Sequence, residues 1–271
     1  MKKKKDKQVF YYTDERNDDF SRIKIKTRCI DETFKFVRKN VVRRFASFLL
    51  YYFIAIPLVF IYEKLILRVK FVNRKAVKKY KKKSYFLYGN HTGYIDAFTP
   101  NLISFPHRNR IIVSPETVSI KGLRNIVQML GAIPLPTEFR GMKKFVKAIE
   151  FYNKKSNITI YPEAHIWPYY NGVRAFTYSS FGYPVKLNAP VFAFFTAYTK
   201  PKGFLSCFRK ANITVYVSNP IFADEGLSEQ EKKKNICDKV YNFMLEKSKY
   251  SDYEVIEYIC VKSNEKQENY D

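Results

Sequence analysis

The spacing of apolar residues changes character near residue 84. Before it, a single long uncharged run stands within otherwise polar and basic sequence. After it, short apolar runs alternate with stretches in which apolar residues recur at helical spacing. We therefore divide the chain into a basic N-terminal region over residues 1–83, a folded domain over 84–260 and a polar tail over 261–271.

Five short apolar runs within the domain predict β-strands. Four of them are continuous, which is typical of strands that are covered on both faces of a sheet. The fifth alternates, with Ile213, Val215 and Val217 on one face. The predicted strands are residues 84–88, 110–113, 158–161, 191–198 and 212–217.

Helical patterns separate these runs. In residues 141–155, Met142, Phe145 and Ile149 fall on one helical face. A later helix begins at Ser228, which forms a capping-box pattern with Glu231. Strands that alternate with helices predict an α/β fold with a mostly parallel central sheet flanked by helices.

The long apolar run, residues 46–62, reads ASFLLYYFIAIPLVFIY and carries no charge. Its length lies at the lower limit for crossing a bilayer, and Pro57 predicts a kink. Basic residues flank both ends, so the usual charge asymmetry of a spanning helix is missing. We expect a helical segment that docks on the membrane or enters it shallowly. The alternative is a buried core helix.

Charge bears on the choice of partner. Lys and Arg total 49 against 25 Asp and Glu, a net charge of +24, which implies a polyanion such as nucleic acid or an anionic membrane. The basic stretch over residues 74–83 follows the apolar run and could contact lipid headgroups. We expect an anionic membrane surface, with the domain on its cytoplasmic face, and no nucleic acid. A non-enzymatic basic protein that binds either polyanion remains the rival hypothesis.

Candidate chemistry lies directly after the first predicted strand, in the segment NHTGYID. His91 stands at the carboxyl end of that strand, where ligand sites gather in α/β sheets, and Asp96 follows five residues later. A turn through Thr92, as a helix-capping hydroxyl, and the flexible Gly93 would bring Asp96 to one imidazole nitrogen. The other nitrogen would then act as a general base on a substrate hydroxyl. The spacing is common, and a structural histidine is the alternative.

Other reactive groups are sparse. The four cysteines lack the C-x-x-C spacing of a zinc or redox site. His165 could join His91, Asp96 and Glu163 around a metal, but no supporting residues accompany this set. We expect no metal and no cofactor.

Four blocks of sequence, in order, resemble those of the glycerolipid acyltransferase family, typified by lysophosphatidate acyltransferases. NHTGYID is similar to the N-H-x4-D motif, and GAIPLP resembles the second block, an apolar strand that leads to an arginine. YPE is similar to the third block, F-P-E-G-T-R-S, and NAPVFA to the fourth, an apolar strand opened by proline. The resemblance covers residues 84–200, and the blocks are residues 90–96, 131–136, 161–163 and 188–193.

The resemblance implies specific roles. His91 would deprotonate the acceptor hydroxyl, and Asp96 would orient His91. Glu163 would help to shape the acceptor site. The remaining substrate-binding candidates are Asn90, Arg140 and Arg174.

Two departures from the family's blocks concern the arginines. Three residues separate Arg140 from the second block, whereas the family's arginine sits close to the strand. In the third block, residues 164–167 read AHIW where the family has G-T-R-S, so Arg174 is expected to supply the missing charge. Either arginine could instead be an ordinary surface residue.

The resemblance implies an enzyme of phospholipid biosynthesis. It would transfer a fatty acyl group from acyl-coenzyme A or acyl-carrier protein to a lysophospholipid, 1-acyl-glycerol-3-phosphate. Glycerol phosphate, a glycolipid or a cell-wall polyol are alternative acceptors that would use the same catalytic pair.

Overall fold

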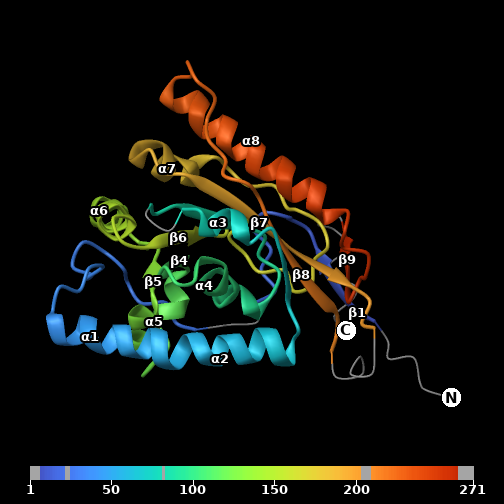
Figure 1. Cartoon of the computed structure of the whole chain (residues 1–271), viewed down its shortest axis with the longest axis horizontal. Coiled ribbons are helices and arrows are strands. Elements are labelled where there is room, and N and C mark those ends of the chain that lie inside the picture. Colours follow the sequence, from blue (N-terminus) through green and yellow to red (C-terminus); the bar gives the residue numbers. More distant parts are fainter. Residues whose placement is uncertain (1–6, 22–24, 81–82, 203–208, 262–271) are drawn as a thin grey trace.

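A seven-stranded, mostly parallel sheet runs through the centre of the molecule, with helices on both sides (Figure 1). The structure is a computed structural model that describes residues 7–21, 25–80, 83–202 and 209–261. Among the strands of the described residues, β7 and β8 are the only pair that runs antiparallel, so the predicted α/β fold class is confirmed. In spatial order the strands are β2 (Lys70–Val72), β8 (Asn212–Val217), β7 (Val191–Thr199), β3 (Phe86–Gly89), β6 (Asn157–Ile160), β4 (Asn109–Val113) and β5 (Ala132–Pro134).

All five predicted strands are present, with ends shifted by up to two residues. The sheet also includes β2, which pairs in parallel with β8 and lies before residue 84, where we expected the folded domain to begin. The sequence signal for β2 is weak because only three residues, Lys-Phe-Val, form this edge strand. Nearly the whole predicted polar tail lies outside the described residues.

Side chains of the central strands alternate between two apolar cores. Phe86 and Tyr88 of β3 enter one core, together with residues of α6 and α8. Leu87 points the other way and packs with Phe192 and Ile103. The α-helices that follow β2 along the chain are α3 (Lys75–Lys78), α4 (Thr99–Ser104), α5 (Arg124–Leu130), α6 (Met142–Asn153), α7 (Gly182–Leu187) and α8 (Glu229–Ser248).

The last helix, α8, begins as the sequence predicts. The Ser228 side chain accepts a hydrogen bond from the Glu231 amide, and the Glu231 carboxylate accepts one from the Ser228 amide. Ile236, Val240 and Met244 are buried against the sheet. The capping-box pattern therefore identified the start of this helix.

The apolar run lies within one continuous helix over Val41–Ile66, which Figure 1 shows along one side of the molecule. The mean hydropathy of its most apolar 18-residue stretch is 2.1, so the helix is long and apolar enough to cross a membrane. Only 22% of that stretch is buried, so it is not a core helix. The helix continues past Pro57, and the segments before and after this proline's α-helical turn are π-helical. Its segments are α1 (Val41–Leu49), η1 (Leu50–Ala55), α2 (Ile56–Phe60) and η2 (Ile61–Ile66).

One stripe of this helix packs lengthwise on the domain. Tyr51, Ile56, Val59 and Glu63 are buried, and the helix contacts α4 and α5 along its length. Its other faces expose large apolar side chains, among them Phe53 at 67%. Because the helix lies lengthwise on the domain, its remaining apolar faces are exposed along the side of the molecule.

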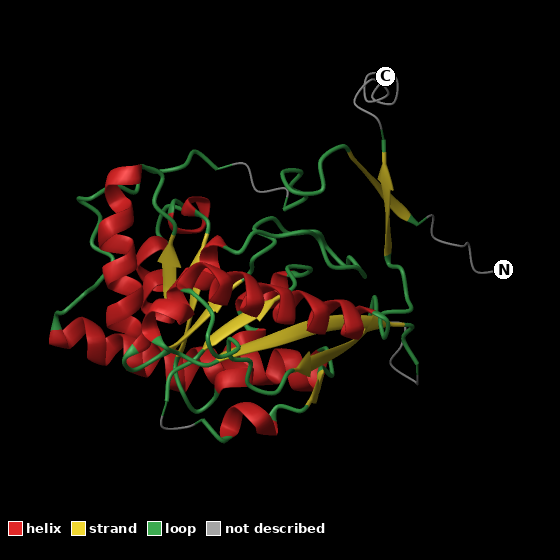
Figure 2. Ribbon diagram, turned by 90° about the horizontal axis from the view of Figure 1, so that it is seen from above, coloured by secondary structure: helices red, strands yellow, loops and turns green. Residues whose placement is uncertain are grey.

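A second, two-stranded sheet stands to one side of the central one (Figure 2). Its strands, β1 (Gln8–Tyr12) and β9 (Ile256–Cys260), come from distant parts of the chain and pair in parallel. Trp167, on the loop after β6, packs against this ribbon: its ring stacks on Tyr258 at 4.9 Å and meets Tyr12 edge-on at 4.7 Å. The ribbon therefore covers the loop that follows Glu163.

Candidate active site

His91 and Asp96 lie together at the carboxyl end of β3. Nδ1 of His91 and Oδ2 of Asp96 are 2.9 Å apart. His91 follows the strand by two residues, and Asp96 sits on a short 3₁₀ turn, η3 (Tyr94–Ala97). The structure thus brings together the two residues that the sequence singled out.

Asp96 itself closes the turn. Its Oδ2 accepts hydrogen bonds from the amides of Thr92, at 2.7 Å, and Gly93, at 2.9 Å, as well as from His91. The expectation that the Thr92 hydroxyl caps this turn is wrong, because that hydroxyl pairs with the Tyr198 hydroxyl at 3.0 Å. Gly93 has an extended backbone (φ −165°), which any residue can adopt, so its flexibility is not required. The site instead favours a residue without a side chain, because a Cβ there would lie 3.3 Å from Tyr198 Oη.

Tyr161 holds the imidazole from one face. Its ring stacks on His91 at 4.5 Å with an interplanar angle of 20°, and its hydroxyl donates to the Asp96 carbonyl. About a quarter of the His91 side chain, 25%, stays exposed. Because Nδ1 is occupied by Asp96, Nε2 is the nitrogen left to accept a proton from a substrate.

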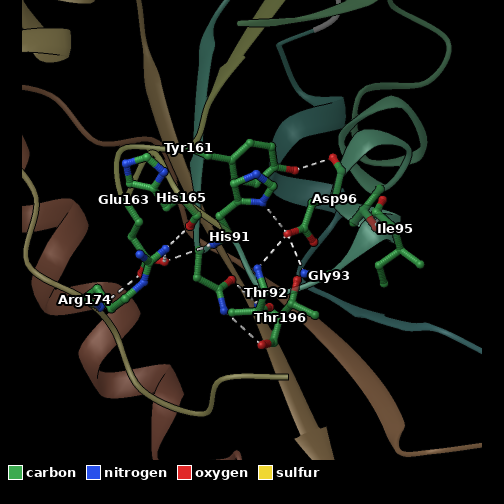
Figure 3. A network of polar contacts seen from close by, with 12 residues as sticks. His91, Thr92, Gly93, Ile95, Asp96, Tyr161, Glu163, His165, Arg174 and Thr196 are labelled. Carbon is green, nitrogen blue, oxygen red and sulfur yellow. Dashed lines mark hydrogen bonds and ion pairs between the residues drawn. The ribbon is translucent and has the colours of Figure 1, made fainter. Parts of the chain in front are cut away.

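On the other side of His91 lies a buried ion pair (Figure 3). The Arg174 guanidinium and the Glu163 carboxylate are 3.1 Å apart. The same carboxylate accepts hydrogen bonds from the His91 amide at 3.2 Å and the Arg174 amide at 3.1 Å. Burial raises the pKa of Glu163, and the neighbouring charge of Arg174 opposes that rise. Glu163 therefore positions the backbone of His91 rather than its ring.

The loop between Glu163 and Arg174 is tied to the His91 turn. Ala164 has a left-handed backbone (φ +64°), and the loop then returns so that Trp167 N donates to His91 O at 3.0 Å and Tyr169 N to Thr92 O at 2.7 Å. Arg174 lies over the Trp167 ring at 4.9 Å. The stretch AHIW therefore forms a supporting wall behind the histidine.

Asn90 and Arg140 make other contacts than those expected of substrate-binding residues. Asn90 is fully buried, and its side chain exchanges two hydrogen bonds with the backbone of Thr196 on β7. Arg140 has a side chain 72% exposed and lies 3.6 Å from Glu32. It follows edge strand β5, three strand positions or about 14 Å from β3. The structure does not join either side chain to the His91 imidazole.

Glu63 is a residue of this site that the sequence reasoning missed. It belongs to η2, is fully buried, and its Oε1 accepts a hydrogen bond from Thr99 at 2.9 Å. Its Oε2 and Asp96 Oδ1 are both buried without a hydrogen-bond partner among the described residues. Burial raises the pKa of Glu63 to about 8, and the Asp96 charge adds to the rise. The available signal was an acidic residue directly after the apolar run.

A metal is not suggested by this arrangement. Among residues 7–21, 25–80, 83–202 and 209–261, no group of three or more His, Cys, Asp or Glu side chains could hold a metal ion. His165 turns toward Asp19, with Nδ1 and Oδ2 3.9 Å apart.

Comparison with known proteins places this geometry in context. The sequence model of the acyltransferase family matches residues 68–217, more than half of the chain. No curated protein matches the sequence. Among solved structures, the 1-acyl-sn-glycerophosphate (LPA) acyltransferase PlsC from Thermotoga maritima is similar, at 19% identity and a TM-score of 0.50. The match covers 79% of this chain and 90% of that one, and it shows a shared fold.

Proposed function

Because the chain belongs to the acyltransferase family, we propose that it transfers a fatty acyl group from an acyl thioester to a lysophospholipid hydroxyl. The acceptor we propose is 1-acyl-glycerol-3-phosphate, the compound after which the Thermotoga maritima acyltransferase is named. The observation that carries the proposal is the 2.9 Å contact between His91 and Asp96, with the imidazole partly open to solvent.

The reaction uses His91 as a general base. Nε2 takes the proton of the acceptor hydroxyl while that oxygen attacks the thioester carbonyl. The tetrahedral intermediate then collapses, the C–S bond breaks, and the leaving thiolate takes the proton back from the imidazolium. An ester and a free thiol result, and no group beyond the two substrates is consumed. Coenzyme A and acyl-carrier protein both satisfy this chemistry as the thiol carrier.

Asp96 holds His91 in the tautomer that the reaction needs and stabilises the imidazolium. The Arg174 side chain is 1% exposed, so it cannot contact the phosphate of an acceptor that enters from solution. Its role, together with Glu163, is to form the wall beside the histidine. The exposed Arg140 stays our candidate for the acceptor's phosphate, which would require it to leave Glu32. Asn90 acts by fixing the end of β3 to β7.

We also propose that the Val41–Ile66 helix docks the enzyme on the membrane, where its acceptor resides. A helix with one face packed on the domain and large apolar side chains on the rest suits a position in the plane of the bilayer surface. The net charge of +24 favours an anionic leaflet. Such a leaflet faces the cytoplasm, so we place the catalytic domain on that side.

The test is acyl transfer by the purified full chain. Acyl-coenzyme A and acyl-carrier protein are supplied as donors against a panel of acceptors: 1-acyl-glycerol-3-phosphate, glycerol phosphate and a glycolipid. His91→Ala should lower the rate by a factor of about 10² or more. His107→Ala, the same change at a histidine outside the site, serves as the matched control. Full activity of His91→Ala would rule out this mechanism.

The rival hypothesis, a basic protein that binds nucleic acid, is tested separately. Nucleic-acid affinity falls steeply with salt because binding releases counterions. We expect vesicle binding to depend on the apolar helix, and no tight salt-dependent binding of DNA or RNA. The opposite pattern would favour the rival.

A further inference from the structure

A large pocket lies at the far end of the sheet from His91. Its volume is about 780 Å³. Arg108 and Arg110 flank the first residue of β4, and Ser156 directly precedes β6, so the pocket lies at the amino ends of these parallel strands. His91 and Glu163 follow the carboxyl ends of β3 and β6. The pocket is therefore separate from the candidate active site.

The charged side chains that line it are basic. Within the part of the chain that the structure describes, seven basic side chains line the pocket and no acidic one does. Among the described residues, none of the seven takes part in a salt bridge, although such pairs occur elsewhere on the molecule, as between Lys186 and Glu150. The seven are Arg38, Arg43, Arg44, Arg108, Arg110, Lys154 and Lys155.

Several of these cations are partly buried and have no anionic partner among the described residues. Arg108 donates to the Ser47 hydroxyl and the Met129 carbonyl, and the Arg110 guanidinium lies 3.5 Å from the centre of the Tyr152 ring. The Nε atoms of Arg38, Arg108 and Arg110 are buried without a hydrogen-bond partner within the described part of the chain. Burial lowers the pKa of Arg110 to about 10, and the charge of Arg108 acts in the same direction. Burial and the charge of Arg43 likewise lower the pKa of Arg38. Burying like charges close together costs free energy, and a bound anion would lower that cost.

One wall of the pocket is apolar and belongs to the docking helix. Phe45, Phe48 and Tyr52 line it from α1 and η1. Phe45 is 62% and Phe48 45% exposed, so this wall continues into the apolar surface of the helix. A ligand that fits both parts has an anionic head and apolar chains.

We propose that this pocket binds the headgroup of one anionic phospholipid, distinct from the acyl acceptor. The phosphate lies among the guanidinium and ammonium groups, and the acyl chains lie along Phe45 and Phe48. The lipid anchors the amino end of the docking helix to the leaflet. The inference rests on the proposed membrane docking and is independent of the acyl-transfer reaction.

The test is native mass spectrometry of the full chain in neutral detergent, titrated with phosphatidylglycerol or phosphatidylcholine. The pocket variant Arg44→Gln/Lys155→Gln removes two exposed charges from the rim. The matched control, Lys234→Gln/Lys249→Gln, removes two exposed charges at α8, on the opposite side of the molecule (Figure 1). Acyl transfer to detergent-dispersed substrate is measured in parallel, and the pocket variant should transfer acyl groups at the wild-type rate.

We expect the wild type and the control to retain one phosphatidylglycerol molecule and no phosphatidylcholine. The pocket variant should bind phosphatidylglycerol about tenfold more weakly or worse. Equal weakening in both variants would show diffuse charge and overturn the site, as would displacement of the lipid by an equal concentration of inorganic phosphate. Because retention is measured without turnover, a failure of acyl transfer leaves this result standing.

Discussion

Arg174 and Glu163 form an ion pair of 3.1 Å in which neither side chain exposes more than 1% of its surface. The third block of the resembled family has its arginine where this chain has Ile166. Arg174 enters from farther along the same loop and meets the carboxylate that binds the His91 amide. The pair thus fixes His91 from its backbone side.

Removing one partner of this pair should destabilise the fold. Arg174→Met leaves a buried carboxylate without its cation, and we expect a loss of about 3–5 kcal/mol in the free energy of unfolding. Glu163→Gln added to Arg174→Met should recover part of it, because no charge is then left unpaired. Urea unfolding gives the free energy of unfolding of the wild type, Arg174→Met and the double variant. Lys186→Met, which breaks an exposed pair, should cost about 1 kcal/mol or less. Similar losses for both methionine variants would refute the prediction.

Asp96→Asn should retain the fold and lose activity. The asparagine carbonyl can still accept from the Thr92 and Gly93 amides, but no carboxylate remains to stabilise a protonated His91. We expect kcat to fall by about 10²–10⁴. The measurement is a pH–rate profile together with thermal unfolding. Asp224→Asn, an exposed carboxylate paired with Lys239, should leave both unchanged.

Glu63 predicts a pH dependence of stability. Its pKa rises to about 8 in the folded protein, through burial and then the Asp96 charge, with the Thr99 hydrogen bond and Lys64 opposing. The folded state therefore prefers the neutral acid. The contribution of Glu63 to the free energy of unfolding is complete below the ordinary pKa of 4.5 and is lost as the pH rises through 8. Glu63→Gln should therefore flatten the fall in Tm across that window.

A matched variant separates this effect from general titration. Glu246 is exposed, and its pKa is lowered by the Lys247 hydrogen bond, so Glu246→Gln should leave the slope between pH 4.5 and 8 as it is in the wild type. The Glu63 assignment fails if the Glu63→Gln protein keeps the wild-type slope.

The exposed face of the docking helix should control vesicle binding. Phe53→Glu places a charge where the side chain is 67% exposed, and we expect binding to vesicles to weaken about ten- to hundredfold. Sedimentation with vesicles measures this, and transfer on detergent-dispersed substrate should be kept. Leu245→Glu, at a 45% exposed position on α8, is the control. Equal weakening by the two changes would argue against docking through this helix.

Much of the sheet could be predicted from sequence, because strands buried on both faces are continuous apolar runs. The edge strand β2 and the separate two-stranded sheet of β1 and β9 could not. β2 has three residues, and β1 pairs with β9 across most of the chain's length, so neither leaves a local pattern. Parallel pairing between distant segments is set by tertiary packing, here around Trp167.

The site shows the same division. His91 and Asp96 are five residues apart, so a single turn joins them and a motif can reveal them. Arg174 could be named from its chemistry but not placed, because the left-handed turn at Ala164 decides where the loop goes. Glu63 lies 33 positions before Asp96 and meets the Thr99 hydroxyl only once the apolar helix has packed on the domain.

The pairing of β1 with β9 has a consequence for how the protein is made. A ribosome releases residues 8–12 long before residues 256–260 exist, so β1 must wait without its partner through nearly all of synthesis. The Tyr258 ring, which stacks on Trp167 and completes the cover of the loop behind His91, arrives only with this late strand. The enzyme therefore matures after translation has passed residue 260, and a chain stalled earlier would carry His91 and Asp96 without the completed wall behind them.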